Sequence, residues 1–183
     1  MEEIFALYET YGRADYIGEP VSQMEHMSQA ATSAMEEGYD DEVVLAAFFH
    51  DIGHICVMSV AANNMDGFGT KSHEKIGADY LRAKGFPERI ARLVENHVQA
   101  KRYLTFISKD YYEKLSEASK KTLAFQGGKM NPTEAANFER DPLFDVSIRM
   151  RHWDEQAKET DVPLIDLEKL KSKVKAILSP RTT

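Results

Sequence analysis

The sequence of 183 residues contains one cysteine, Cys56, and one tryptophan. A single cysteine cannot form an intramolecular disulfide, and it cannot supply the paired thiolates of a cysteine-rich metal site. Any metal ion bound by this chain must therefore be held by nitrogen and oxygen ligands from histidine, aspartate or glutamate side chains.

Long apolar runs are also absent. The longest strongly apolar stretch, residues 43–49, is far shorter than the roughly 20 residues that a helix needs to cross a bilayer. The acidic start, Met-Glu-Glu, lacks the basic residues that open a signal peptide. These absences predict a cytoplasmic protein with no membrane partner.

Positive charge is in the minority, with 23 Lys and Arg against 30 Asp and Glu and a net charge of −7. The resulting negative field opposes nonspecific binding to nucleic acid, so we expect no nucleic-acid partner. With 43% hydrophobic residues, the chain can bury one sizeable core. We therefore expect a single domain that spans residues 1–183.

Hydrophobic spacing is helical almost throughout, and no alternating run of Val, Ile and Thr indicates a strand. The pattern predicts an all-α fold. Gly38 and Gly85 mark helix ends, and Pro87 fits a first helical turn. Two connections, 57–72 and 127–132, are expected to lie as loops over a pocket. The predicted helices are 2–10, 22–37, 41–50, 74–84, 87–97, 98–107, 110–114, 116–126, 132–140, 143–159 and 164–178.

The His50-Asp51 pair carries the strongest local signal for chemistry, because it directly follows the apolar run at 43–49. Two polar side chains at a buried helix end are costly unless they are hydrogen-bonded or bind a metal ion. Further histidines and an aspartate lie on or beside other predicted helices, from which they can converge on this pair. The candidate metal ligands are His26, His50, Asp51, His73, His97 and Asp154.

Each of these residues has an ordinary alternative explanation. A lone histidine such as His73 is more often hydrogen-bonded or exposed, and a lone aspartate such as Asp154 is more often a helix cap or an ion-pair partner. The His-Asp dipeptide also arises by chance in many chains. The metal interpretation therefore depends on the set and not on any one member.

The order of the set resembles the HD-domain superfamily of metal-dependent helical proteins, and His73 and His97 resemble its dinuclear members. Longer segments resemble the PhnZ-like diiron oxygenases, which are HD-domain proteins that degrade organophosphonates and are related to myo-inositol oxygenase. These segments are Asp-Tyr-Ile-Gly-Glu at 15–19, Gln-Met-Glu-His at 23–26, 73–81, 97–104, Gln-Gly-Gly at 126–128 and 151–155, together with Ser119 and Thr122.

The resemblance implies that two iron ions are bound in a mixed Fe(II)/Fe(III) state. One ion would be held by His26, His50 and Asp154. The other would be held by His73 and His97, and Asp51 would bridge the two.

The resemblance also implies roles outside the ligand set. Tyr16, aided by Glu19, would occupy an open position of the second ion until substrate arrives, although the residues alone indicate only a loop tyrosine beside a solvated acid. The implied phosphonate-binding residues are His54, Lys101, Ser119, Thr122 and Arg151. The implied catalytic residues are Tyr16, Glu19, His54 and Lys101.

Helical spacing gives limited independent support to two of these roles. Lys101 lies one turn after His97 and shares its face, and Arg151 lies three residues before Asp154. The ordinary alternatives are a surface lysine whose stem covers apolar side chains and a surface ion pair.

The reaction implied by the resemblance is O2-dependent cleavage of the carbon–phosphorus bond of a 1-hydroxyphosphonate, giving a carboxylic acid and phosphate. Its substrate would be 2-amino-1-hydroxyethylphosphonate or the trimethylammonium analogue. A 2-oxoglutarate-dependent hydroxylase is the implied pathway partner. Two alternatives stay open: an HD-domain metal-dependent phosphohydrolase, and a non-enzymatic helical regulatory module that keeps a metal ion for stability.

Overall fold

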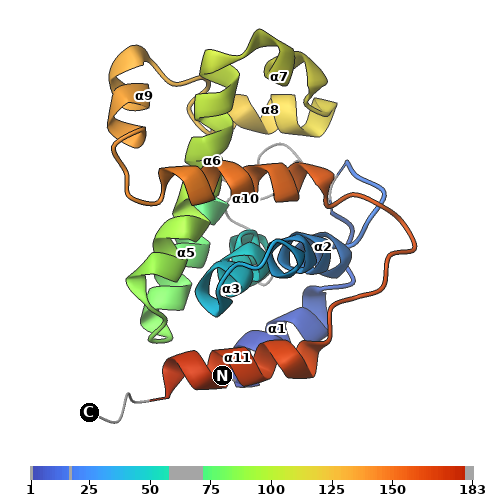
Figure 1. Cartoon of the computed structure of the whole chain (residues 1–183). Helices are drawn as coiled ribbons and strands as arrows, with labels where there is room; N and C mark the ends of the chain where they lie inside the picture. The colour runs from blue at the N-terminus through green and yellow to red at the C-terminus, as the bar shows by residue number, and fades with distance from the viewer. Residues whose placement is uncertain (1, 17, 58–71, 180–183) are drawn as a thin grey trace.

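A computed structural model of the chain describes residues 2–16, 18–57 and 72–179 (Figure 1). This part contains helices and no strand, only an isolated bridge between Asp15 and Ser22, so the predicted all-α fold is confirmed. None of the helices described is long and apolar enough to cross a membrane. The helices are α1 (Glu2–Tyr11), α2 (Gln23–Glu36), α3 (Asp41–Phe49), α4 (Ile52–Cys56), α5 (His73–Ala83), α6 (Glu88–Ile107), α7 (Lys109–Lys114), α8 (Glu117–Phe125), α9 (Pro132–Phe138), α10 (Phe144–Gln156) and α11 (Leu167–Leu178).

Local sequence sets where α2 begins and ends. Ser22 and Glu25 form a capping box, in which the Ser22 hydroxyl accepts from the Glu25 backbone N–H at 3.3 Å. The Glu25 carboxylate accepts from the Ser22 backbone N–H at 2.7 Å in return. Gly38 follows the helix at φ +77°, a conformation that glycine adopts without strain. The capping box therefore fixes the first turn of the helix that carries His26.

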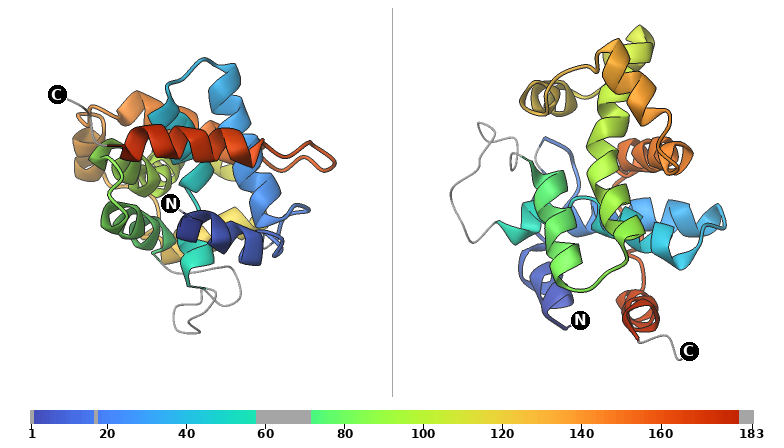
Figure 2. Two further views of the ribbon diagram at one scale, coloured as in Figure 1. Left: turned by 90° about the horizontal axis from the view of Figure 1, so that it is seen from below. Right: turned by 90° about the vertical axis from the view of Figure 1, so that its left-hand side faces the viewer.

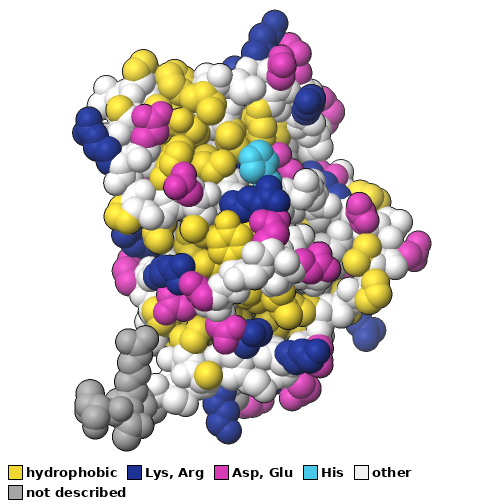
Figure 3. Space-filling model, viewed as in Figure 1, with side chains coloured by type: hydrophobic (Ala, Val, Ile, Leu, Met, Phe, Trp, Pro, Cys, Tyr) yellow, Lys and Arg dark blue, Asp and Glu magenta, His cyan; other side chains and the backbone are white. Residues whose placement is uncertain are grey.

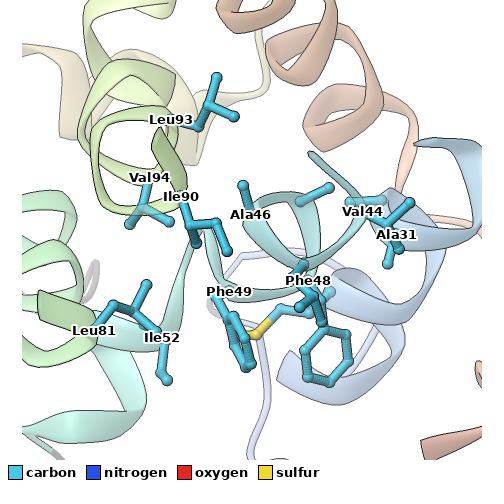
Figure 4. Packing of buried hydrophobic residues seen from close by; sticks show 14 of the residues in the cluster. Ala31, Val44, Ala46, Phe48, Phe49, Ile52, Leu81, Ile90, Leu93 and Val94 are labelled. Atoms are coloured by element: carbon cyan, nitrogen blue, oxygen red, sulfur yellow. The ribbon is translucent and has the colours of Figure 1, made fainter. Parts of the chain in front are cut away.

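The core is built around α3, whose residues from Val43 to Phe49 are all buried. Figure 4 shows Phe49 of α3 next to Ile90 of α6, and Phe48 on the side toward Ala31 of α2. Because α3 is apolar on every side, it lies between other helices rather than at the surface. The residue that ends it, His50, is consequently delivered into the interior.

The long helix α6 contributes side chains to two separate apolar clusters (Figures 1 and 2). Its first half, up to Val94, belongs to the large apolar cluster around α3. Its second half, from Ala100, belongs to a smaller cluster that includes Met130 and Phe138. α7, α8 and α9 gather around this second half, whereas α1 and α11 lie at the opposite end (Figure 1). The segment 95–99 of α6 therefore lies where the two clusters meet.

α10 crosses α6 near this junction and is anchored at its far end by Trp153 (Figure 1). The indole is fully buried, and its Nε1–H donates to the Glu37 carboxylate at 2.8 Å. The ring of Tyr39 meets it edge-on at 5.0 Å. These contacts fix the rotation of α10 and with it the direction of the neighbouring Asp154.

The helix predictions were wrong at two places: one helix was divided into two, and one short helix was not predicted. The other predicted helices agree with the structure within three residues at each end. Residues 87–97 and 98–107 form one continuous helix, α6, because neither His97 nor Val98 interrupts the backbone hydrogen bonds. α4 was not predicted, because five residues are too short to show a helical period. The predicted 57–72 loop lies almost wholly outside the described residues. The 127–132 connection packs on α6, where the Gly128 carbonyl accepts from Arg102 Nε at 3.0 Å.

Candidate metal centre

The six predicted ligands meet in one buried cluster at the junction of the two apolar clusters. Each is at most 4% exposed. In agreement, little histidine surface is visible on the face of the molecule drawn in Figure 3. Separate elements carry them, and rigid helices are what holds a ligand set in a fixed geometry. They are His26 of α2, His50 and Asp51 after α3, His73 at the start of α5, His97 in α6 and Asp154 in α10.

Asp51 lies at the middle of this cluster, and its two carboxylate oxygens face different histidine pairs. Oδ2 lies 3.6 Å from His26 Nε2 and 3.5 Å from His50 Nε2. Oδ1 lies 3.2 Å from His73 Nε2 and 3.3 Å from His97 Nε2. A carboxylate that presents one oxygen to each of two nitrogen pairs has the arrangement of a bridge between two cations.

Within each pair the ring nitrogens approach closely. The Nε2 atoms of His26 and His50 lie 3.0 Å apart, and so do those of His73 and His97. Two nitrogens bound at about 2.1 Å to one ion at right angles lie about 3 Å apart. Asp154 Oδ1 joins the first pair, at 3.4 Å from His26 Nε2. The donor set of imidazole nitrogens and carboxylate oxygens suits a first-row transition metal such as iron or zinc.

Backbone carbonyls of the described residues orient His26, His50 and His97. A carbonyl oxygen only accepts hydrogen bonds, so each of these rings carries its proton on Nδ1 and presents the Nε2 lone pair to the cluster. The Nδ1 contacts, all between 2.6 and 2.8 Å, are His26 with Ala157, His50 with Ala47 and His97 with Val94.

The electrostatics of the cluster favour a cation. Burial raises the pKa of the Asp51 carboxyl, but His50 and the other facing histidines outweigh this and hold it well below its usual range. Burial likewise raises the pKa of Asp154, but Arg151 and His26 outweigh burial, so this pKa also lies well below its usual value. Burial lowers the pKa of His50, whereas Asp51 raises it to about 9. A metal ion would therefore compete with protons for these ligands.

A close helix contact positions His73. A Cβ on Gly53 of α4 would lie 1.9 Å from the His73 carbonyl oxygen, so only glycine fits there. A Cβ on Gly77 would lie 2.9 Å from Ile52 Cγ2, so α5 also needs glycine at this crossing. Ser72, just before His73, has the left-handed φ of +57°. Such a conformation in a non-glycine residue costs energy and is typical of functional sites.

Two buried cations flank the cluster. Lys101 is 3% exposed, and its ammonium donates to Thr122 Oγ1 at 2.8 Å and to Gln126 Oε1 at 2.9 Å. Burial, with help from the charge of Arg151, lowers the pKa of Lys101 to about 7. Arg151 is 5% exposed and donates through Nη1 to Asp154 Oδ2. Lys101 and Arg151 thus form a positively charged rim beside the carboxylates of Asp51 and Asp154.

Arg151 is also held from the side opposite Asp154. Its Nε donates to the Tyr111 hydroxyl at 3.0 Å and to Glu155 Oε1 at 3.0 Å. The Tyr111 hydroxyl in turn donates to Glu155. Tyr111 therefore links α7 to α10 next to the centre.

The other predicted substrate contacts lie on α8 and α4. Ser119 is half-buried one turn before Thr122, whose hydroxyl donates to the Ser119 carbonyl at 3.2 Å. The His54 ring stacks on His73 with 4.0 Å between ring centroids. Burial and the nearby His73 lower the pKa of His54 to about 3, so the ring is neutral. His54 also groups with Asp51 and His73 as a possible metal-binding set, a role that the sequence analysis did not give it.

Tyr16 lies over the cluster, with its ring stacked on His26 at 3.8 Å between centroids. Burial and the charge of Asp51 raise the pKa of Tyr16 well above its usual value, so the phenol keeps its proton. The Glu19 backbone N–H donates to the Tyr16 carbonyl at 2.9 Å. The Glu19 carboxylate accepts from Lys158 Nζ at 2.6 Å, so the contact between Glu19 and Tyr16 is one of backbone atoms.

Sequence reasoning gave no separate role to Tyr111, Gln126 or Glu155. Spacing was a usable signal for two of them, because Gln126 lies four residues after Thr122, and Glu155 lies four residues after Arg151. Tyr111 had no such signal, since packing of the short helix α7 brings it to the centre.

Comparison with known proteins agrees with this geometry. The HD domain family matches residues 24–131, which is more than half of the chain. The chain therefore belongs to the HD-domain family.

Three relatives narrow this assignment. An uncharacterized protein of Acanthamoeba polyphaga mimivirus is 46% identical over 85% of this chain and 71% of its own length. The [1-hydroxy-2-(trimethylamino)ethyl]phosphonate dioxygenase (glycine-betaine-forming) of Leisingera caerulea is 39% identical over 91% and 84%, respectively. The hydroxymethylphosphonate dioxygenase of Gimesia maris is 34% identical over 96% and 86%. Within the HD-domain family, the chain is a PhnZ-like oxygenase.

Proposed function

We propose that this protein uses two iron ions and O2 to cleave the carbon–phosphorus bond of a 1-hydroxyphosphonate. The observation that carries the proposal is the position of Asp51, whose two oxygens face two separate histidine pairs at 3.2–3.6 Å. One pair is completed by Asp154. The other has no second aspartate among the residues described, which leaves room for substrate and O2.

In this proposal His26, His50 and Asp154 would hold the first ion, His73 and His97 would hold the second, and Asp51 would serve both. When bound in the mixed Fe(II)/Fe(III) state, the iron pair supplies the redox chemistry that activates O2 and lowers the pKa of a coordinated hydroxyl. Nitrogen and oxygen donors of this kind also accept zinc or magnesium, neither of which supplies that redox chemistry.

The phosphonate group is bound by the positively charged rim. The Lys101 ammonium and the Arg151 guanidinium are both buried beside the centre, where charge-assisted hydrogen bonds are strong. Thr122 and Ser119 on α8 add hydroxyl groups near Lys101. His54 is neutral and stacked on His73, and a ring N–H of His54 would donate a hydrogen bond to a phosphonate oxygen.

Tyr16 covers the centre until substrate arrives. Burial and the charge of Asp51 keep the phenol protonated, with the pKa of Tyr16 well above its usual value, and its ring lies flat on His26. A substrate hydroxyl that enters the centre would displace the phenol. The turn that carries Tyr16 is closed by the Glu19 backbone N–H, and Gly18 in that turn has a φ of +82°.

The proposed reaction balances with one O2. The C–H and C–P bonds of the substrate carbon together give up four electrons, which reduce O2, and its oxygen atoms leave in the carboxylic acid and phosphate. We propose 2-amino-1-hydroxyethylphosphonate or its trimethylammonium analogue as substrate. The nitrogen substituent would be held near the protein's acidic or aromatic side chains. A 2-oxoglutarate-dependent hydroxylase would supply the 1-hydroxyl group, and the chain would act as a single domain in the cytoplasm.

The test is to measure O2 uptake and phosphate release together, with iron-loaded protein and a panel of 1-hydroxyphosphonates. We expect one O2 consumed per phosphate released, and no phosphate under nitrogen. Phosphate released from phosphomonoesters under nitrogen, with magnesium or manganese as the metal, would favour the phosphohydrolase instead. Metal bound without turnover on either panel would favour the regulatory module.

A further inference from the structure

The helix α8 carries hydroxyl groups proposed to bind the phosphonate, but it packs only lightly on the rest of the protein. Of its nine residues, all of them described, Leu123 is the one that is buried. Polar contacts must therefore fix its position. Two of these come from the Lys101 ammonium of α6, which donates to Thr122 Oγ1 at 2.8 Å and to Gln126 Oε1 at 2.9 Å. These two acceptors lie four residues apart and share one face of the chain at this end of α8.

The turn that follows α8 brings the chain straight back to α6. Gly127 and Gly128 have φ values of +95° and +71°, a left-handed conformation that glycine adopts without strain. The Gly128 N–H donates to the Leu123 carbonyl at 2.8 Å, which closes the end of the helix. The position of Gln126 therefore depends on where this turn is held.

Arg102 of α6 holds the turn with both its side chain and its backbone. Its Nε donates to the Gly128 carbonyl at 3.0 Å, and its own carbonyl accepts from the Met130 N–H at 3.3 Å. The other guanidinium nitrogens donate to Glu134 Oε1 of α9 at 2.7 Å and to Gln99 Oε1 of α6 at 3.0 Å. The guanidinium is thus fixed by the turn, by α9 and by α6 itself, and its side chain is only 12% exposed.

Lys101 and Arg102 are consecutive in α6, so one helix holds α8 by its side chains and by its end. We propose that Arg102 is a positioning residue for the phosphonate, which sets α8 so that its two acceptors aim the Lys101 ammonium at the centre. An ammonium has three N–H donors, so two neutral acceptors can orient it while a phosphonate oxygen accepts from the third. This inference rests on the proposed function, and it deepens it by naming what orients the cation that binds the substrate.

The test is the Kd of methylphosphonate, measured by calorimetry on iron-loaded protein under nitrogen, together with KM and kcat for a 1-hydroxyphosphonate in air. Arg102→Lys keeps the positive charge, but one ammonium cannot reproduce the three contacts of the guanidinium fork. We expect Kd and KM to rise by roughly 5- to 10-fold, with kcat changed by less than about twofold. Arg89→Lys is the matched control, because Arg89 donates to Asp40 and Glu42 at the other end of α6, and its Kd should equal that of wild type.

A second variant disturbs the same turn without changing Arg102. Alanine adopts a φ of +71° only with strain, so Gly128→Ala should raise the Kd of methylphosphonate in the same direction as Arg102→Lys. Circular dichroism of each variant identifies any loss caused by unfolding.

A double-mutant cycle separates positioning from a general structural effect. In Lys101→Met the oriented ammonium is already absent, so adding Arg102→Lys should weaken methylphosphonate binding no further. Equal losses from Arg102→Lys in both backgrounds would overturn the proposal, and so would an Arg102→Lys variant with the Kd of wild type. A wild type that neither binds methylphosphonate nor releases phosphate would instead contradict the proposed function itself, so the two failures are distinguishable.

Discussion

At the scale of single residues, the centre combines groups whose charges are adjusted by burial. Asp51 and Asp154 are buried but ionised, because histidines and Arg151 face them. Lys101 is buried with two neutral hydrogen-bond acceptors, and its pKa falls to about 7. A lysine in this state is poised to accept a dianionic ligand, which would restore its positive charge.

The lowered pKa of Lys101 predicts the pH dependence of substrate binding. As the pH rises through about 7, the free enzyme loses the ammonium, so kcat/KM should fall on the alkaline side. In Lys101→Met this alkaline limb should disappear, and kcat/KM near pH 6 should fall by about 10- to 100-fold, the loss of one charge-assisted hydrogen bond. A limb that persists in Lys101→Met would assign it to another group.

The same residue predicts a stability effect with a definite sign. The unfolded chain holds the lysine proton up to its usual pKa of 10.5, whereas the folded protein releases it near 7. Between these values the unfolded state binds more protons, so the stability of the fold should rise with pH across that window. Below pH 7 the burial cost is fully present, and Lys101→Met should be more stable than wild type by about 1 kcal/mol in urea unfolding.

Tyr111 provides a second prediction at the residue scale, because its hydroxyl contacts both Arg151 and Glu155. Tyr111→Phe keeps the ring but frees one side of the guanidinium, so KM for the phosphonate should rise by about 5- to 10-fold, with kcat less affected. Tyr112→Phe is the control, since that neighbouring tyrosine lies against Lys129 at 4.5 Å. Equal effects of the two variants on KM would contradict the role given to Tyr111.

At the scale of helices, the close crossing of α4 and α5 decides where His73 lies. Gly53 meets the His73 carbonyl, and Gly77 meets Ile52, so the two helices approach through glycines on both sides. α5 and its histidine are therefore positioned by backbone contact, which side-chain repacking cannot easily relax.

Gly53→Ala should separate the two halves of the centre. Its Cβ would lie 1.9 Å from the His73 carbonyl oxygen, so α5 must move and His73 must leave its place opposite Asp51. We expect a loss of about 2–4 kcal/mol in unfolding free energy and of one bound metal ion per chain. Gly38→Ala is the comparison variant, because its Cβ would meet nothing within 4 Å, so the strain of its φ of +77° should lower stability without displacing a ligand and both ions should stay bound. Retention of both ions in Gly53→Ala would show that this crossing does not position His73.

The helices and their ligands differed in how well the sequence predicted them. Periodicity identified the long helices, and the buried His50-Asp51 pair at the end of α3 was recognisable from the apolar run before it. α4 and the continuity of α6 were missed, since neither depends on a pattern that repeats along the chain. The contacts of Tyr111 with Arg151 and Glu155 depend on tertiary packing, so spacing along the sequence could not reveal them.

At the scale of the whole molecule, the centre lies between two apolar clusters that share α6. The large cluster contains Val94 and the smaller one Ala100, and His97 lies on the same helix between them. α10 crosses this junction and adds Arg151 and Asp154. Because α6 and α10 each carry a ligand and contribute side chains to both clusters, bound metal should stabilise the fold as one unit.

The most direct test of the account is the metal content of Asp51→Ala, measured by elemental analysis after anaerobic iron loading. Among the carboxylates that the structure describes, Asp51 is the one that faces both histidine pairs, so its removal should release both ions together. His73→Ala and Asp154→Ala should each keep about one ion, and the exposed Asp79→Ala should keep about two, as in wild type. Loss of both ions in Asp51→Ala alone is the predicted result, and retention of a full pair in that variant would contradict the bridged centre.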